Sequence, residues 1–374
     1  MALTRSARRR RIGYISLLVF IIALAGGWSL LWQYAAGKAQ ATIDDWRARE
    51  AAAGRIYTCS SQTIGGYPFR FEVNCGQPSA EFRSNQPPIA IKTANILIAA
   101  QIYQPTLLIG EFIGPLTIAA PGQPPHMIVN WKAGQTSLHG TPTAPDRASL
   151  AMDSPIVDQV TGGHRQSLMR ANRVEIHGRI VAGSAASNPV IEMVLRLAAG
   201  SAPGLHPAAV TPIDAEITGV VRGLSDLSPM PWPQRLRQMQ ASGGRIDITA
   251  ARVKQGETIA VGNGALSLNS AGRLEGQMRV TVAGLEPFLS AIGAQKALQS
   301  SPDMDKVAGA LDRLLPGLGG VAREQAGANI SLGISALGQQ TTLEGKRAVT
   351  LPLRFTDGAI FLGPIPIGKA PAMF

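Results

Sequence analysis

The side chains that could carry out catalysis are few in this sequence, and their spacing matches no catalytic motif. The histidines form no HExxH, HxH or similar ligand spacing; they are His126, His139, His164, His177 and His206. His164 has Asp153, Asp158 and Ser167 nearby in the sequence, which are the residue types of a hydrolase triad. Geometry, and not closeness along the chain, defines a triad. We therefore predict that the protein is not an enzyme and has no metal site and no cofactor.

The glycine-rich segments also lack the spacing of nucleotide-binding loops. The sequence has no GxSxG, no GxxxxGK[ST], and no GxGxxG placed between a strand and a helix. Gly317-Leu318-Gly319-Gly320 follows a predicted helix instead of preceding one. It therefore does not create the anion site that nucleotide loops place at a helix N-terminus.

The two cysteines, Cys59 and Cys75, are close together in the sequence. In an oxidising compartment such a pair is expected to form a disulfide, which stabilises a fold by about 3 kcal/mol for a short loop. Two thiolates without neighbouring histidines supply only half of a tetrahedral metal site. Two separate buried thiols are the remaining alternative.

The first recognisable element of the chain is an uncharged segment near the N-terminus. Residues 12–37 carry no charge, and five arginines precede them: Arg5, Arg8, Arg9, Arg10 and Arg11. As a helix rising about 1.5 Å per residue, Ile12–Trp32 covers about 30 Å of hydrocarbon. Arginines remain on the cytoplasmic side of a membrane, and tryptophans such as Trp28 and Trp32 favour its interface. This pattern predicts a single-pass anchor with a cytoplasmic N-terminus.

Two alternatives to an uncleaved anchor exist. Ala39-Gln40-Ala41 resembles a signal-peptide cleavage site, but the apolar core of a signal peptide is only about 7–15 residues long. The segment could also be a buried helix of a soluble protein, although the preceding arginines argue against this. We expect a cytoplasmic arm at 1–11, a transmembrane anchor at 12–34 and a juxtamembrane helix at 35–54. A periplasmic domain at 55–374 would follow, divided into two sheets near the Pro-rich segment 200–212.

The rest of the chain alternates between apolar and polar residues, which is typical of antiparallel strands with one buried face. The alternation is found at 69–74, 127–132, 173–177, 191–197, 213–218, 245–249, 274–282, 330–334 and 349–355. Gly-containing breaks separate these segments, as hairpins require. We predict a mainly β fold, a large and curved antiparallel sheet with two or three amphipathic helices. Helical spacing occurs at 285–292, 304–315 and 233–240.

The composition restricts the class of partner. The 374 residues carry a net charge of +11, and part of it comes from the N-terminal arginines. No basic segment with interleaved aromatic residues follows the anchor, so nucleic acid is not an expected partner. The predicted partners are the inner membrane, phospholipid or another envelope lipid, and envelope proteins.

The segment GGYPFRFEVNC, which begins at Gly65, resembles a known family. Together with the C-terminal segment LPLRFTDG from Leu351, it is similar to domain-of-unknown-function family 2125 of Gram-negative bacteria. The resemblance implies an inner-membrane-anchored envelope protein in which Cys59 and Cys75 fill the two cysteine positions, and it implies no reaction. The strand pattern is also similar, more loosely, to AsmA-like lipid-handling β proteins.

Three hypotheses about function follow. The protein binds lipid on an apolar sheet face, or it is a scaffold or assembly factor that binds envelope proteins, or it is an enzyme of envelope glycan or lipid. The motif residues Gly65, Gly66, Tyr67, Pro68 and Phe69 are expected to form a tight turn into a strand. A docking edge for a partner is the functional alternative for the same residues.

Overall fold

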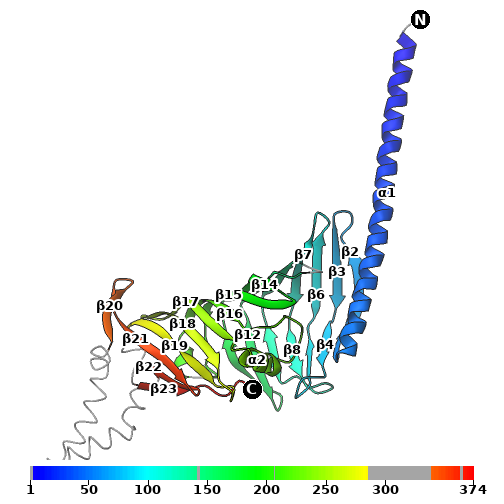
Figure 1. Cartoon of the computed structure of the whole chain (residues 1–374). Helices are drawn as coiled ribbons and strands as arrows, with labels where there is room; N and C mark the ends of the chain where they lie inside the picture. Colours follow the sequence, from blue (N-terminus) through cyan, green and yellow to red (C-terminus); the bar gives the residue numbers. More distant parts are fainter. Residues whose placement is uncertain (1–2, 141–143, 206, 285–337, 363–364) are drawn as a thin grey trace, which may run out of the picture. The chain divides into compact units, whose positions relative to one another are not determined.

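A computed structural model of the chain describes residues 3–140, 144–205, 207–284, 338–362 and 365–374 (Figure 1). The predicted strand at 330–334 and the predicted helices at 285–292 and 304–315 lie outside these residues. The chain forms two compact units, residues 1–124 and residues 125–374. Both are built from antiparallel sheets, which confirms the predicted fold class.

The first unit begins with a single helix, α1 (Leu3–Ala52), which contains both the predicted anchor and the predicted juxtamembrane helix. The helix is long and apolar enough to cross a membrane. It ends just before Gly54, which adopts a φ of +78°, a left-handed conformation that favours glycine at helix ends. The sequence suggested an end at residue 54, and the helix ends at Ala52.

Eight strands complete the first unit, as two groups of four hydrogen-bonded neighbours. One has the order β1-β4-β5-β8, and the other has the order β2-β3-β6-β7. The strands are β1 (Arg55–Thr58), β2 (Ser61–Gly65), β3 (Arg70–Gly76), β4 (Ser79–Phe82), β5 (Ile89–Lys92), β6 (Asn95–Gln101), β7 (Gln104–Ile113) and β8 (Leu116–Ala119). β1 and β2 are edge strands, and α1 contacts both of them.

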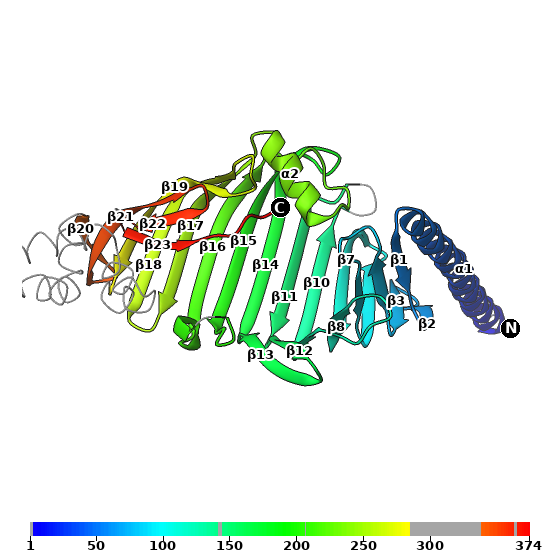
Figure 2. The same ribbon diagram turned by 90° about the horizontal axis from the view of Figure 1, so that it is seen from below.

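The second unit consists of a long antiparallel sheet and a small one. The long sheet has the order β10-β11-β14-β15-β16-β17-β18-β19-β21-β22-β23, with β20 also paired to β21, and the small sheet has the order β9-β12-β13. Figure 2 shows β14, β15 and β16 side by side. The segment 201–212, where the sequence suggested a division, connects β15 to β16 within this unit.

The bounds of the strands in the second unit match most of the predicted alternating segments. They are β9 (Met127–Asn130), β10 (Ala133–His139), β11 (Arg147–Asp153), β12 (Ile156–Thr161), β13 (His164–Arg170), β14 (Arg173–Ser184), β15 (Ser187–Gly200), β16 (Ile213–Arg222), β17 (Arg245–Gln255), β18 (Thr258–Leu268), β19 (Leu274–Ala283), β20 (Gln339–Leu343), β21 (Lys346–Thr356), β22 (Ala359–Leu362) and β23 (Ile365–Lys369). A short 3-10 helix, η1 (Pro207–Val210), precedes β16.

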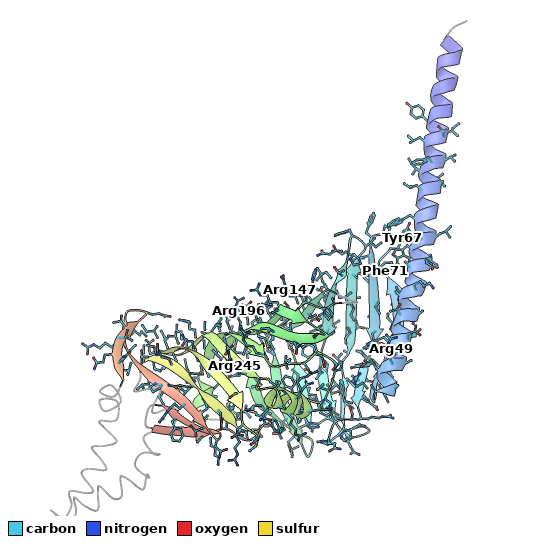
Figure 3. The ribbon with its side chains drawn as sticks, in the orientation of Figure 1. Arg49, Tyr67, Phe71, Arg147, Arg196 and Arg245 are labelled. Atoms are coloured by element: carbon cyan, nitrogen blue, oxygen red, sulfur yellow. A yellow bond between two sulfur atoms is a disulfide. The ribbon has the colours of Figure 1, made fainter. Side chains whose placement is uncertain are left out.

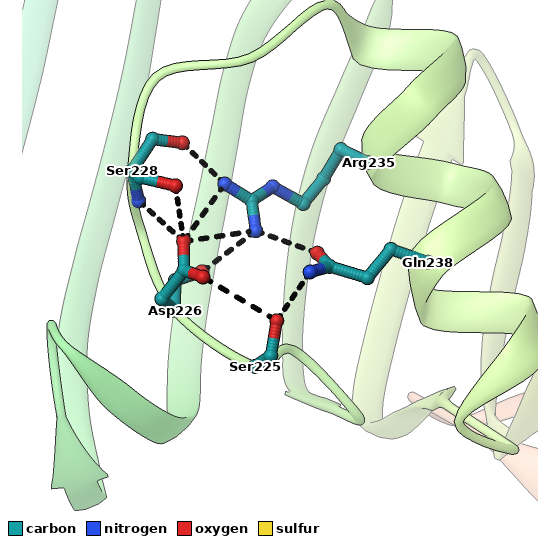
Figure 4. A network of polar contacts seen from close by, with 5 residues as sticks. All are labelled: Ser225, Asp226, Ser228, Arg235 and Gln238. Carbon is teal, nitrogen blue, oxygen red and sulfur yellow. Dashed lines mark hydrogen bonds and ion pairs between the residues drawn. The ribbon is translucent and has the colours of Figure 1, made fainter.

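The predicted helix at 233–240 is confirmed as α2 (Trp232–Ala241), which lies between β16 and β17. Its Arg235 is only 7% exposed and is hydrogen-bonded to the loop that precedes the helix (Figure 4). The guanidinium donates to the carbonyl of Asp226 at 2.8 Å, to the carbonyl of Ser228, and to Oε1 of Gln238 at 2.8 Å. The two bonds to the carbonyls of Asp226 and Ser228 fasten α2 to the loop that precedes it.

Candidate functional site

The GGYPF motif forms the turn between β2 and β3, as the sequence indicates. Arg70 N donates to the carbonyl of Gly66 at 3.1 Å, and Gly66 adopts a φ of +96°. A Cβ atom at Gly66 would lie 2.6 Å from the carbonyl oxygen of Arg70. The turn therefore requires glycine at position 66, both for its backbone conformation and for the close approach of the returning strand.

Aromatic side chains of α1 pack against this turn from the apolar part of the helix. Trp32 is 8% exposed, stacks on Phe71 with ring centroids 5.5 Å apart, and meets Tyr67 edge-on at 5.7 Å. Its indole N–H donates to the carbonyl of Arg70 at 3.3 Å, and the indole of Trp28 donates to the carbonyl of Pro68 at 3.0 Å. Figure 3 shows Tyr67 and Phe71 next to the helix. We call this contact the helix–hairpin junction.

Cys59 and Cys75 form a disulfide at the opposite end of the same strands, with their Cα atoms 5.4 Å apart. Arg47 of α1 donates to the sulfur of Cys59 at 3.1 Å and to the side-chain oxygen of Gln62. Gln62 in turn donates to Gln40 of α1 at 2.7 Å. The helix is therefore bonded to β2 and β3 near the turn and again near the disulfide.

The last turn of α1 is fixed by an ion pair with the first strand. The guanidinium of Arg55 makes two bonds to the carboxylate of Glu50, at 2.5 and 3.0 Å, and both side chains are less than one-fifth exposed. The hydrogen bond from Arg55 holds the pKa of Glu50 below its ordinary value. Trp46 stacks on Tyr57 of β1 at 4.8 Å, which adds an aromatic contact beside the ion pair.

The long sheet of the second unit has one polar face, whose central row crosses four strands. The register places Glu175, Arg196, Glu216 and Arg252 opposite one another. Arg196 lies 3.7 Å from Glu175 and 3.1 Å from Glu216, while Arg173 binds both Glu175 and Asp153. The hydrogen bond from Arg173 lowers the pKa of Glu175. These residues alternate in charge across the strands, so they neutralise one another on a solvated surface.

The opposite face of the same strands, which we call the apolar face, is formed by three aligned rows. These are Ile176, Leu195, Ile217 and Ala251; Gly178, Met193, Gly219 and Ile248; and Ile180, Ile191, Val221 and Ile246. In Figure 3, Arg147 and Arg196 lie on the upper side of this unit, whereas α2 lies on the lower side. Because side chains alternate along a strand, the apolar face is the lower one.

The apolar face is covered at one end of the sheet and open near its middle. The row that contains Leu195 continues through Gly262 and Val280 to Leu351. Leu351 is 1% exposed, but Leu195 is 38% exposed, as is Ile246, and Met193 is 40% exposed. Large apolar side chains on an inward-facing row are normally buried, so the middle of this face is the candidate binding surface.

The residues suggested as a triad are not brought together. His164 and Ser167 are both on β13 and are three residues apart, so their side chains point to opposite faces. His164 pairs with Thr161, and Ser167 pairs with Asp158. Within the ranges that the structure describes, no group of three or more His, Cys, Asp or Glu side chains is arranged to bind a metal ion.

Arg8, Arg9, Arg10 and Arg11 belong to α1 and precede its apolar part. The sequence did not reveal that Trp32 is buried against Phe71, because alternation in a strand and spacing in a helix do not show which faces meet. The one signal was the concentration of aromatic residues in both the helix and the motif. Neither did the sequence show which apolar rows stay exposed.

The family comparison confirms the family resemblance that the sequence indicated. The chain belongs to the family described as "uncharacterized protein conserved in bacteria (DUF2125)", whose family model matches residues 32–371. That match includes Trp32, the GGYPF turn and both cysteines. No curated protein matches the chain. The looser similarity to AsmA-like proteins stays a prediction.

Proposed function

We propose that this chain is a single-pass protein of the bacterial inner membrane whose second unit binds a lipid acyl chain on its apolar face. It acts by binding and not by catalysis, in maintenance of the cell envelope. The N-terminus is cytoplasmic, and the strands of both units are periplasmic. The observation that carries the proposal is the exposure of Met193, Leu195 and Ile246 on an otherwise apolar face.

The membrane part of the proposal rests on α1. Eleven apolar or aromatic side chains from Tyr14 to Leu31 are 52–74% exposed in the structure, which is unfavourable in water and favourable in hydrocarbon. Four consecutive arginines, Arg8–Arg11, precede this part of the helix. Basic residues at one end of a span favour the cytoplasmic side for that end, which leaves the strands on the periplasmic side.

The lipid part rests on the chemistry of the apolar face. The three rows contain Ile, Leu, Met, Val, Ala and Gly and no hydrogen-bonding side chain. An occupant that makes no hydrogen bonds and follows the strands satisfies such a face, and an acyl chain has both properties. A protein partner would normally leave some polar group at an interface of this kind.

The proposal is tested by measuring how much phospholipid stays bound to the full chain during detergent exchange. Leu195→Arg places a charge on the apolar face, and Val194→Arg places the same charge on the polar face of the same strand. We expect tightly held phospholipid in the wild type and in the Val194 variant, and a loss of it in the Leu195 variant. Equal lipid in all three proteins, or none in any of them, would contradict lipid binding on this face.

A further inference from the structure

Three exposed aromatic side chains gather at the tips of two neighbouring hairpins in the first unit. Tyr67 and Phe69 lie in the β2–β3 turn and are 52% and 68% exposed, and Tyr103 lies in the β6–β7 turn and is 77% exposed. The amide of Ile102 donates to the carbonyl of Phe69 at 3.0 Å, which ties the two turns together. We call Tyr67, Phe69 and Tyr103 the aromatic tip.

The aromatic tip is level with the end of the apolar part of α1. The hydroxyl of Tyr67 is 2.8 Å from the hydroxyl of Ser29, and Trp28 donates to the carbonyl of Pro68. The apolar stretch starts at Ile12 and ends at Trp32. At about 1.5 Å per residue, Ser29 lies about 25 Å along the helix from Ile12, close to the far boundary of a hydrocarbon layer of about 30 Å.

We propose that the aromatic tip inserts into the outer interface of the same bilayer that α1 crosses, so that the strands of the first unit rest on the membrane surface. This inference rests on the proposed function, because it requires α1 to span the bilayer. Amphipathic rings favour the headgroup region. The hydrogen bonds to Ser29 and Trp28 fix the position of the tip along α1, and therefore its depth in the bilayer. The guanidinium of Arg70 lies next to the tip, pairs with Glu72 through Nε at 2.8 Å and stays more than half exposed, so its exposed part is suited to a lipid phosphate.

The experiment measures depth at three positions of the full chain in vesicles of phosphatidylethanolamine and phosphatidylglycerol. Both native cysteines are in the disulfide, so a single introduced cysteine can carry an environment-sensitive fluorophore. Tyr103→Cys reports on the tip. Ile113→Cys is the matched control, because Ile113 is 59% exposed and lies at the other end of β7, about 30 Å away at about 3.3 Å per residue. Val19→Cys reports on the span.

We expect a blue shift and quenching by headgroup-labelled nitroxide lipid at position 103, and neither effect at position 113. Position 19 should be quenched by nitroxide on the acyl chain. Quenching at 19 with identical signals at 103 and 113 would refute insertion of the aromatic tip. The same result would still support α1 as a membrane anchor. No quenching at 19 would instead refute the anchor, and with it this inference. Protection of Cys59 and Cys75 from alkylation confirms that each variant has folded.

Discussion

Trp32 is the side chain on which attachment of α1 to the hairpin depends most. It is 8% exposed, stacks on Phe71 and donates a hydrogen bond to the backbone of Arg70. Trp32→Ala removes the ring, its hydrogen bond and both aromatic contacts at once. Its sequence neighbour Leu31 is 58% exposed, which makes Leu31→Ala a matched control on the same helix.

The expected cost follows from the buried area and the aromatic pair. Burial of an aromatic side chain removes about 150–250 Å² from solvent, which is worth about 4–6 kcal/mol at about 25 cal/mol per Å². Measured Trp→Ala and Phe→Ala changes in protein cores cost about 3–5 kcal/mol. We therefore expect Trp32→Ala to weaken the helix–hairpin junction by about 4 kcal/mol, and Leu31→Ala to change it by less than about 0.5 kcal/mol.

Amide hydrogen exchange of the full chain in detergent micelles measures this directly. The free energy of opening of the β2–β3 hairpin should fall in Trp32→Ala, with exchange of its amides about a thousandfold faster. Phe71→Ala should be non-additive with Trp32→Ala by about 1 kcal/mol, because the two rings touch. Unchanged exchange in Trp32→Ala, or an equal change in Leu31→Ala, would show that Trp32 does not hold α1 to the hairpin.

Two further predictions concern ion pairs. Because Arg55 lowers the pKa of Glu50, the pair contributes stability that is present above pH 4.5 and is lost as the pH falls through the lowered pKa. Glu50→Gln should lower the free energy of unfolding by about 1–3 kcal/mol at neutral pH. Thermal unfolding of this variant should depend less on pH in the acidic range. Arg235→Met should cost about 2–4 kcal/mol because it removes the ion pair with Asp226 and leaves the carbonyls of Asp226 and Ser228 without this donor. Exposed Gln234→Met on the same helix should be neutral, and equal melting temperatures of the two variants would contradict the role of Arg235.

Much of the fold could be predicted because strands with one apolar face repeat every two residues. The alternation at 173–177 and 191–197 corresponds to β14 and β15, and the Pro-led helical spacing corresponds to α2. Short strands such as β4 and β5 have too few residues to show a period. They form because neighbouring strands supply hydrogen bonds, and the residues of a short strand do not themselves show which strands will be its neighbours.

The contacts that make up the candidate sites were less predictable. The period of two correctly placed Leu195 and Arg196 on opposite faces, but it could not show that Leu195 is open while Leu351, in the same row, is covered. Coverage depends on segments distant in the sequence. Trp32 was predicted as an interface residue from its place at the end of an apolar stretch. Its stacking on Phe71 depends on the hairpin turn, which brings residues about 40 positions away to the helix.

Site-specific photo-crosslinking in living cells determines whether lipid occupies the apolar face. A photoreactive amino acid at position 195 lies on the apolar face, and one at position 196 lies on the polar face of the same strand. We expect a phospholipid adduct at 195 and none at 196. A crosslink from 195 to another part of the chain, or to a second protein as a scaffold would give, with no lipid adduct, would contradict this expectation.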